Sequence, residues 1–120
     1  MSRVLVFGGR DFHDEAAMVT ALLDELHEGD VVIHGGARGA DALAGDVAGR
    51  LMGHEVIVFP AQWAKYGKGA GPIRNQQMLD EGKPDRAVMF PGGRGTEDMR
   101  TRCEKAGVPV FRKDEGAGDD

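Results

Sequence analysis

Residues 86–99 read RAVMFPGGRGTEDM: an apolar run leads directly into a turn that holds three glycines and an arginine. Similar apolar runs occur elsewhere along the chain: RVLVF (3–7), DVVIH (30–34), HEVIVF (54–59) and VPVF (108–111). Together the runs are rich in β-branched residues and continuous rather than alternating, which is typical of strands covered on both faces of a parallel sheet. We therefore expect each run to be a strand.

Helical stretches lie between these runs. The sequence predicts them at residues 14–28, 41–51, 72–81 and 96–106. Pro72 is favoured in the first turn of a helix, and we expect Thr96 to be an N-cap. Residues 61–71 show no clear period, so we expect a loop there.

Strands and helices alternate through the chain, which is the signature of a doubly wound α/β fold. We predict a single Rossmann-like domain over residues 1–113, with a mostly parallel sheet of about five strands and helices on both faces. Residues 114–120 are acidic and glycine-rich, and we expect them to form a disordered tail. Right-handed crossovers bring the strand-to-helix turns to one edge of such a sheet, where these folds bind ligands.

Glycines concentrate in the turns at that predicted edge. In HGGARGAD, residues 34–41, they permit a positive φ and a close approach of the backbone to an anion. The alternative is a tight turn with close strand–helix packing, and the glycines alone do not decide between the two. The glycines that we expect to bind a ligand are Gly8, Gly9, Gly35, Gly36, Gly39, Gly92, Gly93 and Gly95.

Arginines accompany these glycines. A guanidinium group suits bidentate capture of phosphate or carboxylate, so arginines gathered at one edge of an acidic chain favour a site for a small anion. Solvated surface arginines explain any one of them easily, but all of them less well. The predicted anion-binding arginines are Arg10, Arg38, Arg74 and Arg94, and Thr96 adds a hydroxyl beside the last turn.

Other side chains give weaker signals. Trp63, the only tryptophan, is expected either to stack on a base or to cover the core. Asp41 is expected either to accept hydrogen bonds from ribose hydroxyls or to cap the helix that follows it. The histidines have no metal-ligand spacing, so we expect neither a metal nor a cofactor.

Composition narrows the class of protein. A net charge of −5 argues against a general nucleic-acid binder, which normally has a basic face. No apolar run approaches the length of a membrane-spanning helix, and the opening MSRVLVFGG is too short for a signal peptide. The single cysteine, Cys103, excludes an internal disulfide and fits a reducing compartment. We expect a cytoplasmic protein that has no membrane partner.

Two sets of motifs resemble known families. PGGRGT at residues 91–96, together with RNQQM at residues 74–78, is similar to the paired motif of the Lonely Guy phosphoribohydrolases, long described as lysine decarboxylases. The wider set, FGGRDF, GGARGAD, PAQWAKYGKGAG and RNQQM, more closely resembles the YspA-like branch of the SLOG superfamily. This resemblance covers nearly the whole chain and implies a Rossmann-like fold that binds a nucleotide or a nucleotide-derived ligand at the glycine-rich edge. The resemblance also implies that Arg74 and Asn75 belong to the ligand-binding site.

One departure from the phosphoribohydrolase motif bears on catalysis. Where that motif has a glutamate, this chain has Met99, and a thioether neither stabilises an oxocarbenium-like sugar nor activates water. We therefore expect a sensor or ligand-binding module whose catalytic residues, if any, are unknown. One alternative is a nucleoside-monophosphate N-glycosidase that uses Asp11 or Asp41, and another is a single-stranded DNA binder, which the net charge disfavours. The related enzymes also make a homodimer plausible.

Overall fold

The predicted strands form one sheet in the order β3-β2-β1-β4-β5, and every strand pair is parallel. In this computed structural model the described residues are 1–113, so the predicted tail at 114–120 lies outside them. The inner strands are buried on both faces, whereas the two edge strands are partly exposed. The strands are β1 (Arg3–Phe7), β2 (Val31–His34), β3 (Glu55–Val58), β4 (Arg86–Met89) and β5 (Val110–Arg112).

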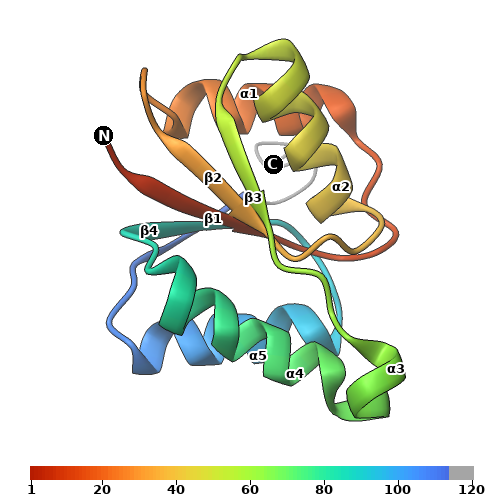
Figure 1. The fold of residues 1–120 in the computed structure, drawn as a ribbon. Coiled ribbons are helices and arrows are strands. Elements are labelled where there is room, and N and C mark those ends of the chain that lie inside the picture. Colours follow the sequence, from red (N-terminus) through yellow and green to blue (C-terminus); the bar gives the residue numbers. More distant parts are fainter. Residues whose placement is uncertain (114–120) are drawn as a thin grey trace.

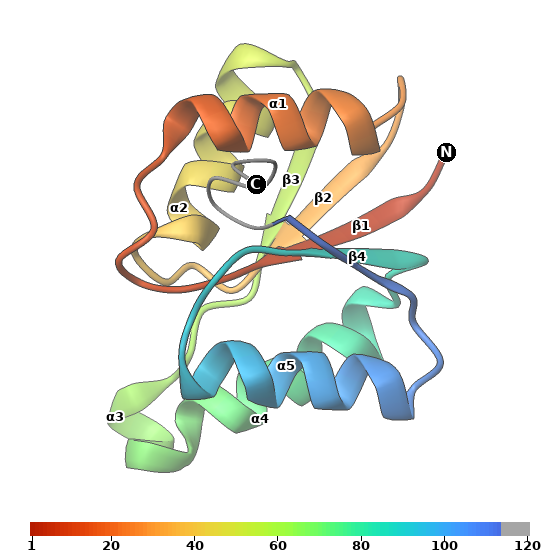
Figure 2. The same cartoon turned by 180° about the vertical axis from the view of Figure 1, so that it is seen from behind.

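Helices cover both faces of the sheet, which confirms the predicted Rossmann-like α/β fold. Figures 1 and 2 show α1 and α2 on one face and α4 and α5 on the other, with α3 beside the start of α4. No helix within residues 1–113 is long and apolar enough to cross a membrane. The helices are α1 (Glu15–Glu25), α2 (Ala40–Gly45), α3 (Trp63–Tyr66), α4 (Ala70–Gln77) and α5 (Arg94–Lys105), with π-helical turns at Asp46–Leu51 and Met78–Gly82 that prolong α2 and α4.

The expected loop at residues 61–71 is wrong. The segment contains α3, a 3₁₀ turn at Gly67–Gly69 and the beginning of α4. Its turns are too short to show a helical period, and the residues of α3 are exposed, so no apolar stripe marks them. Pro72 still lies in the first turn of α4, where its missing N–H costs no helical hydrogen bond.

The expected N-cap at Thr96 is also wrong. Gly93 occupies the N-cap position of α5 without any side-chain capping bond, and the helix begins at Arg94. Thr96 lies within the first turn and is buried against Gly92, whose backbone leaves no room for a side chain beside the Thr96 hydroxyl. Close packing of the turn therefore prevails over the capping preference of threonine.

Strand order places the candidate site. From β1 the chain builds outward through β2 to β3 on one side, and β4 and β5 follow on the other side of β1. The switch in direction lies between β1 and β4, and the turns beyond their carboxyl ends diverge towards opposite faces, which leaves a crevice in folds of this kind. In Figure 1 these turns lie at the right, between α2 and α3.

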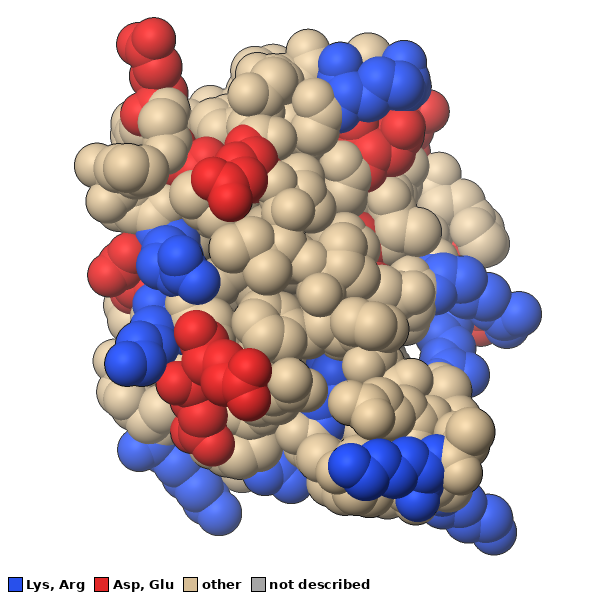
Figure 3. Space-filling view, in the orientation of Figure 1, with Lys and Arg blue, Asp and Glu red and all other residues tan. Residues whose placement is uncertain are grey.

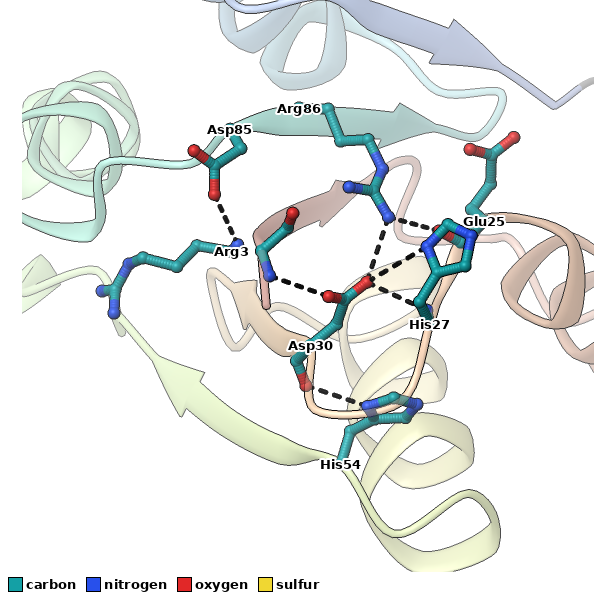
Figure 4. A network of polar contacts seen from close by, with 8 residues as sticks. Arg3, Glu25, His27, Asp30, His54, Asp85 and Arg86 are labelled. Carbon is teal, nitrogen blue, oxygen red and sulfur yellow. Dashed lines mark hydrogen bonds and ion pairs between the residues drawn. The ribbon is translucent and has the colours of Figure 1, made fainter.

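A buried carboxylate ties the opposite edge of the sheet together (Figure 4). Asp30 is 3% exposed and accepts hydrogen bonds from the backbone N–H of Ser2 at 2.8 Å and of His27 at 2.9 Å. The Arg86 guanidinium donates to the same carboxylate at 3.1 Å, and His54 contacts the Asp30 carbonyl at 2.8 Å. Burial opposes ionisation, but these amides and Arg86 together hold the pKa of Asp30 below its ordinary value of 3.8.

We predict that Asp30→Asn lowers the free energy of unfolding by about 3 kcal/mol at neutral pH, because Arg86 loses its buried partner. Because the folded-state pKa of Asp30 is depressed, its contribution is complete above pH 3.8 and is lost as the pH falls through the folded-state pKa. Urea denaturation of wild type and variant should show the difference shrinking in acid. Asp24→Asn, at an exposed position of α1, is the control. An unchanged difference at low pH would contradict the assignment.

Candidate functional site

Two adjoining hollows lie at the carboxyl edge of the sheet, and we call them the large hollow and the small hollow. The large hollow, of about 650 Å³, lies at the switch between β1 and β4 and is lined by the turn after β1, the start of α2, α3, α4 and the turn into α5. The small hollow, of about 340 Å³, lies over the turns after β2 and β3. Arg10, Ala37, Trp63 and Arg74 line both, so the two hollows adjoin at these residues.

The hollows bring together most residues that the sequence singled out. Gly35, Gly36 and Arg38 line the small hollow only. Gly39 and Gly92 line neither. The remaining predicted residues line the large hollow: Gly8, Gly9, Arg10, Asp41, Trp63, Arg74, Asn75, Gly93, Arg94, Gly95 and Thr96.

Gly39 and Gly92 are required by packing. Gly39 has a φ of +84°, and any side chain there would overlap the backbone of Gly9 and Arg10. A Cβ on Gly92 would lie 2.7 Å from the backbone nitrogen of Gly9. The turns after β1, β2 and β4 touch one another directly. Gly39 and Gly92 are therefore explained by close backbone packing and not by contact with a ligand.

The loop between β2 and α2 already holds a carboxylate. The backbone N–H groups of Gly35 and Ala37 donate to one oxygen of Asp41 at 3.1 and 3.4 Å. Gly36 donates to Nδ1 of His34 at 2.9 Å. The amides that the sequence suggested as an anion cradle are therefore used within the protein, and Asp41 occupies the cradle instead of capping its own helix.

His34 is a neutral part of this loop. Its Nδ1 accepts the Gly36 hydrogen bond, so that nitrogen carries no proton. Burial, and then the positive charge of Arg74, lower the pKa of the imidazole. The ring packs so closely on Gly45 that a Cβ there would overlap the ring edge near Nε2. His34 thus supports the loop rather than supplying charge to the hollow.

Arg74 is half-buried and is held in place by neutral groups. Its Nε donates to the side-chain oxygen of Asn75 at 3.0 Å, and its Nη1 donates to the carbonyl oxygen of Gly35. Its Nη2 has no hydrogen bond, and no carboxylate lies within 4.0 Å of the guanidinium, among residues 1–113. Burial lowers the pKa of Arg74, and the charge of Asp41 opposes that shift. A fixed guanidinium with a free amine therefore lines the large hollow.

Asn75 connects α4 to the first turns of α5. It is 5% exposed, and its amide nitrogen donates to Asp98 at 2.9 Å and to the carbonyl oxygen of Gly95 at 3.4 Å. Arg102 donates to the same Asp98 oxygen at 2.8 Å. Burial opposes ionisation of Asp98, but Arg102 and Asn75 keep the pKa of its carboxyl low. Asn75 thus fixes both Arg74 and the glycine-rich turn.

Arg10 and Trp63 stand where the hollows meet. The Arg10 guanidinium lies 5.7 Å from the centre of the Trp63 ring, which is within cation–π range. Trp63 is 49% exposed, so it does not cover the core as one interpretation held. Figure 3 shows basic side chains gathered on this side of the molecule, between the positions of α2 and α3 in Figure 1.

Sequence reasoning missed several lining residues. Met78 and Asp98 line the large hollow but belong to helices rather than to glycine-rich turns. Met99, noted only as a departure from a motif, is 1% exposed and lines the same wall. Their positions within one turn or so of Arg74 and Thr96 are the signal that could have found them. Within residues 1–113, no three His, Cys, Asp or Glu side chains gather to hold a metal ion.

Comparisons with known proteins identify a family and a similar protein. A family model described as YspA, cpYpsA-related SLOG family matches residues 2–66. The Gene 61 protein of Mycobacterium phage D29 is 42% identical, and the match covers 92% of this chain and 95% of that protein. The family match includes the β2–α2 loop and Trp63, whereas Arg74 and the turn before α5 lie beyond it. The relative's name states no ligand or activity.

We predict that Asp41→Asn stabilises the folded protein. Burial raises the pKa of Asp41 to about 6 despite Arg74 and the two loop amides, so its ionised form costs about 3 kcal/mol at neutral pH. The folded state takes up the proton more readily than the unfolded state between pH 3.8 and about 6, so stability falls as the pH rises through that range. One asparagine oxygen can still accept both amides.

Urea denaturation should therefore give Asp41→Asn a free energy of unfolding about 1–3 kcal/mol above wild type at neutral pH. The gain should vanish below pH 3.8, where both states of the wild type are protonated. Asp24→Asn again serves as the exposed control. Destabilisation at neutral pH would mean that the ionised carboxylate holds the loop together.

Proposed function

Because the chain belongs to the YspA, cpYpsA-related SLOG family, we propose that it binds a nucleotide or a nucleotide-derived small molecule in the large hollow, as a sensor or ligand-binding module. A hollow of about 650 Å³ lies within the usual range of small-molecule sites. Its place at the strand-order switch is the place where open α/β sheets bind ligands.

The observation that carries the proposal is that the protein only partly offsets the charge of Arg74. A half-buried cation is expensive to keep unless an anion or a carboxylate offsets it. No carboxylate lies within 4.0 Å of Arg74 among residues 1–113, and the charge of Asp41 offsets its burial only in part. Its guanidinium is nevertheless oriented by Gly35 and Asn75. An anionic ligand group would supply the missing partner and accept charge-assisted hydrogen bonds from the free amine.

The turn before α5 supports the same assignment. The first backbone N–H groups of a helix have no intrahelical partners, and in α5 no capping side chain within residues 1–113 accepts a hydrogen bond from them. Gly93 at the end of this turn, and Arg94 and Gly95 at the start of the helix, line the large hollow, as does Asp41. Of the two glycine-rich turns, we therefore assign the phosphate to the one before α5, together with Arg74.

Other walls suit the remainder of a nucleotide. The exposed ring of Trp63 offers a surface on which a base can stack. Asp41 has a second carboxylate oxygen that makes no hydrogen bond within the described residues, and it suits a ribose hydroxyl. At the position of the phosphoribohydrolase glutamate, Met99 contributes no carboxylate, which favours binding without hydrolysis.

We predict that Arg74→Ala weakens the binding of nucleoside 5′-monophosphates about tenfold to a hundredfold, the usual effect of losing a charge-assisted hydrogen bond. The matching nucleosides should lose much less, because the guanidinium addresses charge rather than base. Arg74→Lys should restore affinity only in part, since a point charge does not reproduce the planar fork. Isothermal titration calorimetry measures these affinities for the 5′-monophosphates of adenosine, guanosine, cytidine and uridine and for the four nucleosides.

Arg112→Ala is the matched control, because it removes the same charge from an exposed position of β5 that lines neither hollow. Equal losses for nucleotide and nucleoside in Arg74→Ala would show that the arginine is structural. Wild type that binds none of the four nucleotides would refute the proposed function.

A further inference from the structure

The small hollow is not needed to hold a nucleoside monophosphate. The large hollow alone offers a surface for a base, a carboxylate for a ribose and a guanidinium for one phosphate. Yet the small hollow adjoins it at Arg10, Trp63 and Arg74, and has a volume of about 340 Å³. A ligand that reaches Arg74 from the large hollow therefore has space to extend further.

The two hollows differ in charge. The large hollow mixes arginines with the carboxylates of Asp11, Asp41 and Asp98. The small hollow is lined by three arginines and by no carboxylate: Arg10, Arg38 and Arg74. Such a concentration of guanidinium groups without acidic residues suits an anion rather than a sugar or a base.

Arg38 is available to a ligand. Its contact with Asp11 is 3.7 Å long, and the two side chains are 76% and 93% exposed, so this surface ion pair is weak. The floor beside it is bare, because Gly35 and Gly36 carry no side chain. Gly36 has a φ of +76°, and a Cβ there would press on Val58 at 3.0 Å, so backbone conformation and packing both favour glycine at this position.

We propose that the small hollow binds a second phosphate of the ligand, so that the ligand is a nucleotide with at least two phosphates. This inference rests on the proposed function. The first phosphate meets Arg74, where the hollows join, and the second lies between Arg10 and Arg38. Trp63 holds the Arg10 guanidinium at the boundary. The second phosphate belongs either to a 5′-diphosphate chain or to a 3′,5′-bisphosphate, and both present the same chemistry.

The second phosphate subsite is tested by calorimetry with the 5′-monophosphates, 5′-diphosphates and 3′,5′-bisphosphates of adenosine, guanosine, cytidine and uridine. For the base that binds, one of the doubly phosphorylated forms should bind about tenfold or more tighter than the monophosphate. Arg38→Ala should remove that gain and change the monophosphate affinity less than about twofold. The form that shows the gain identifies how the two phosphates are linked.

Arg50→Ala is the matched control, since it removes an exposed arginine of the turn after α2 that lines neither hollow. Thermal unfolding confirms that each variant is folded. If the monophosphate binds but a second phosphate adds no affinity, or if Arg38→Ala weakens both forms equally, the second subsite is refuted while the proposed function stands. If no nucleotide binds at all, both fall.

Discussion

The backbone of Gly35 holds the two opposite charges of the site. Its N–H donates to Asp41, and its carbonyl oxygen accepts from Arg74. A Cβ at this position would overlap the Arg74 guanidinium and lie 2.9 Å from the Asp41 carboxylate, so no other residue fits without moving one of them. The peptide group thus keeps a cation and an anion close together, yet without a direct ion pair between them.

This arrangement leaves both charges poorly satisfied. Burial raises the pKa of Asp41 to about 6 and lowers the pKa of Arg74, and each charge only partly offsets the penalty on the other. Perturbed pKa values of this kind cluster at functional sites, where a bound ligand can supply the missing opposite charge or hydrogen bond. Asp30 is the contrast: its exposed fraction is as low as that of Asp41, but its hydrogen bonds and Arg86 lower its pKa and stabilise the fold. The fold is thus stabilised by Asp30 at one end of the strands, whereas the charges of Asp41 and Arg74 at the carboxyl ends are only partly compensated.

Much of the fold follows from the sequence because parallel strands and their turns have local signatures. Continuous apolar runs ending in glycines predict the strands, and crossover geometry brings the turns to one edge, as found for the turns after β1, β2 and β4. Local signals failed where a tertiary contact decides the outcome. Thr96 is buried against Gly92 instead of capping α5, and Asp41 fills the loop that was expected to hold an anion. Residues 61–71 carry no period because their helical turns are short and exposed.

A crystal structure of the protein with the nucleoside monophosphate that binds most tightly tests the central claim most directly. If the large hollow is the nucleotide site, the density places the phosphate within hydrogen-bond distance of the Arg74 guanidinium, with the nucleoside between the turns after β1 and β4. Asp41 should remain bound to the amides of Gly35 and Ala37, because the loop needs no rearrangement to admit the ligand. Density for the nucleotide on another face of the molecule, or a phosphate that displaces Asp41 from its loop and leaves Arg74 unpaired, would contradict the assignment.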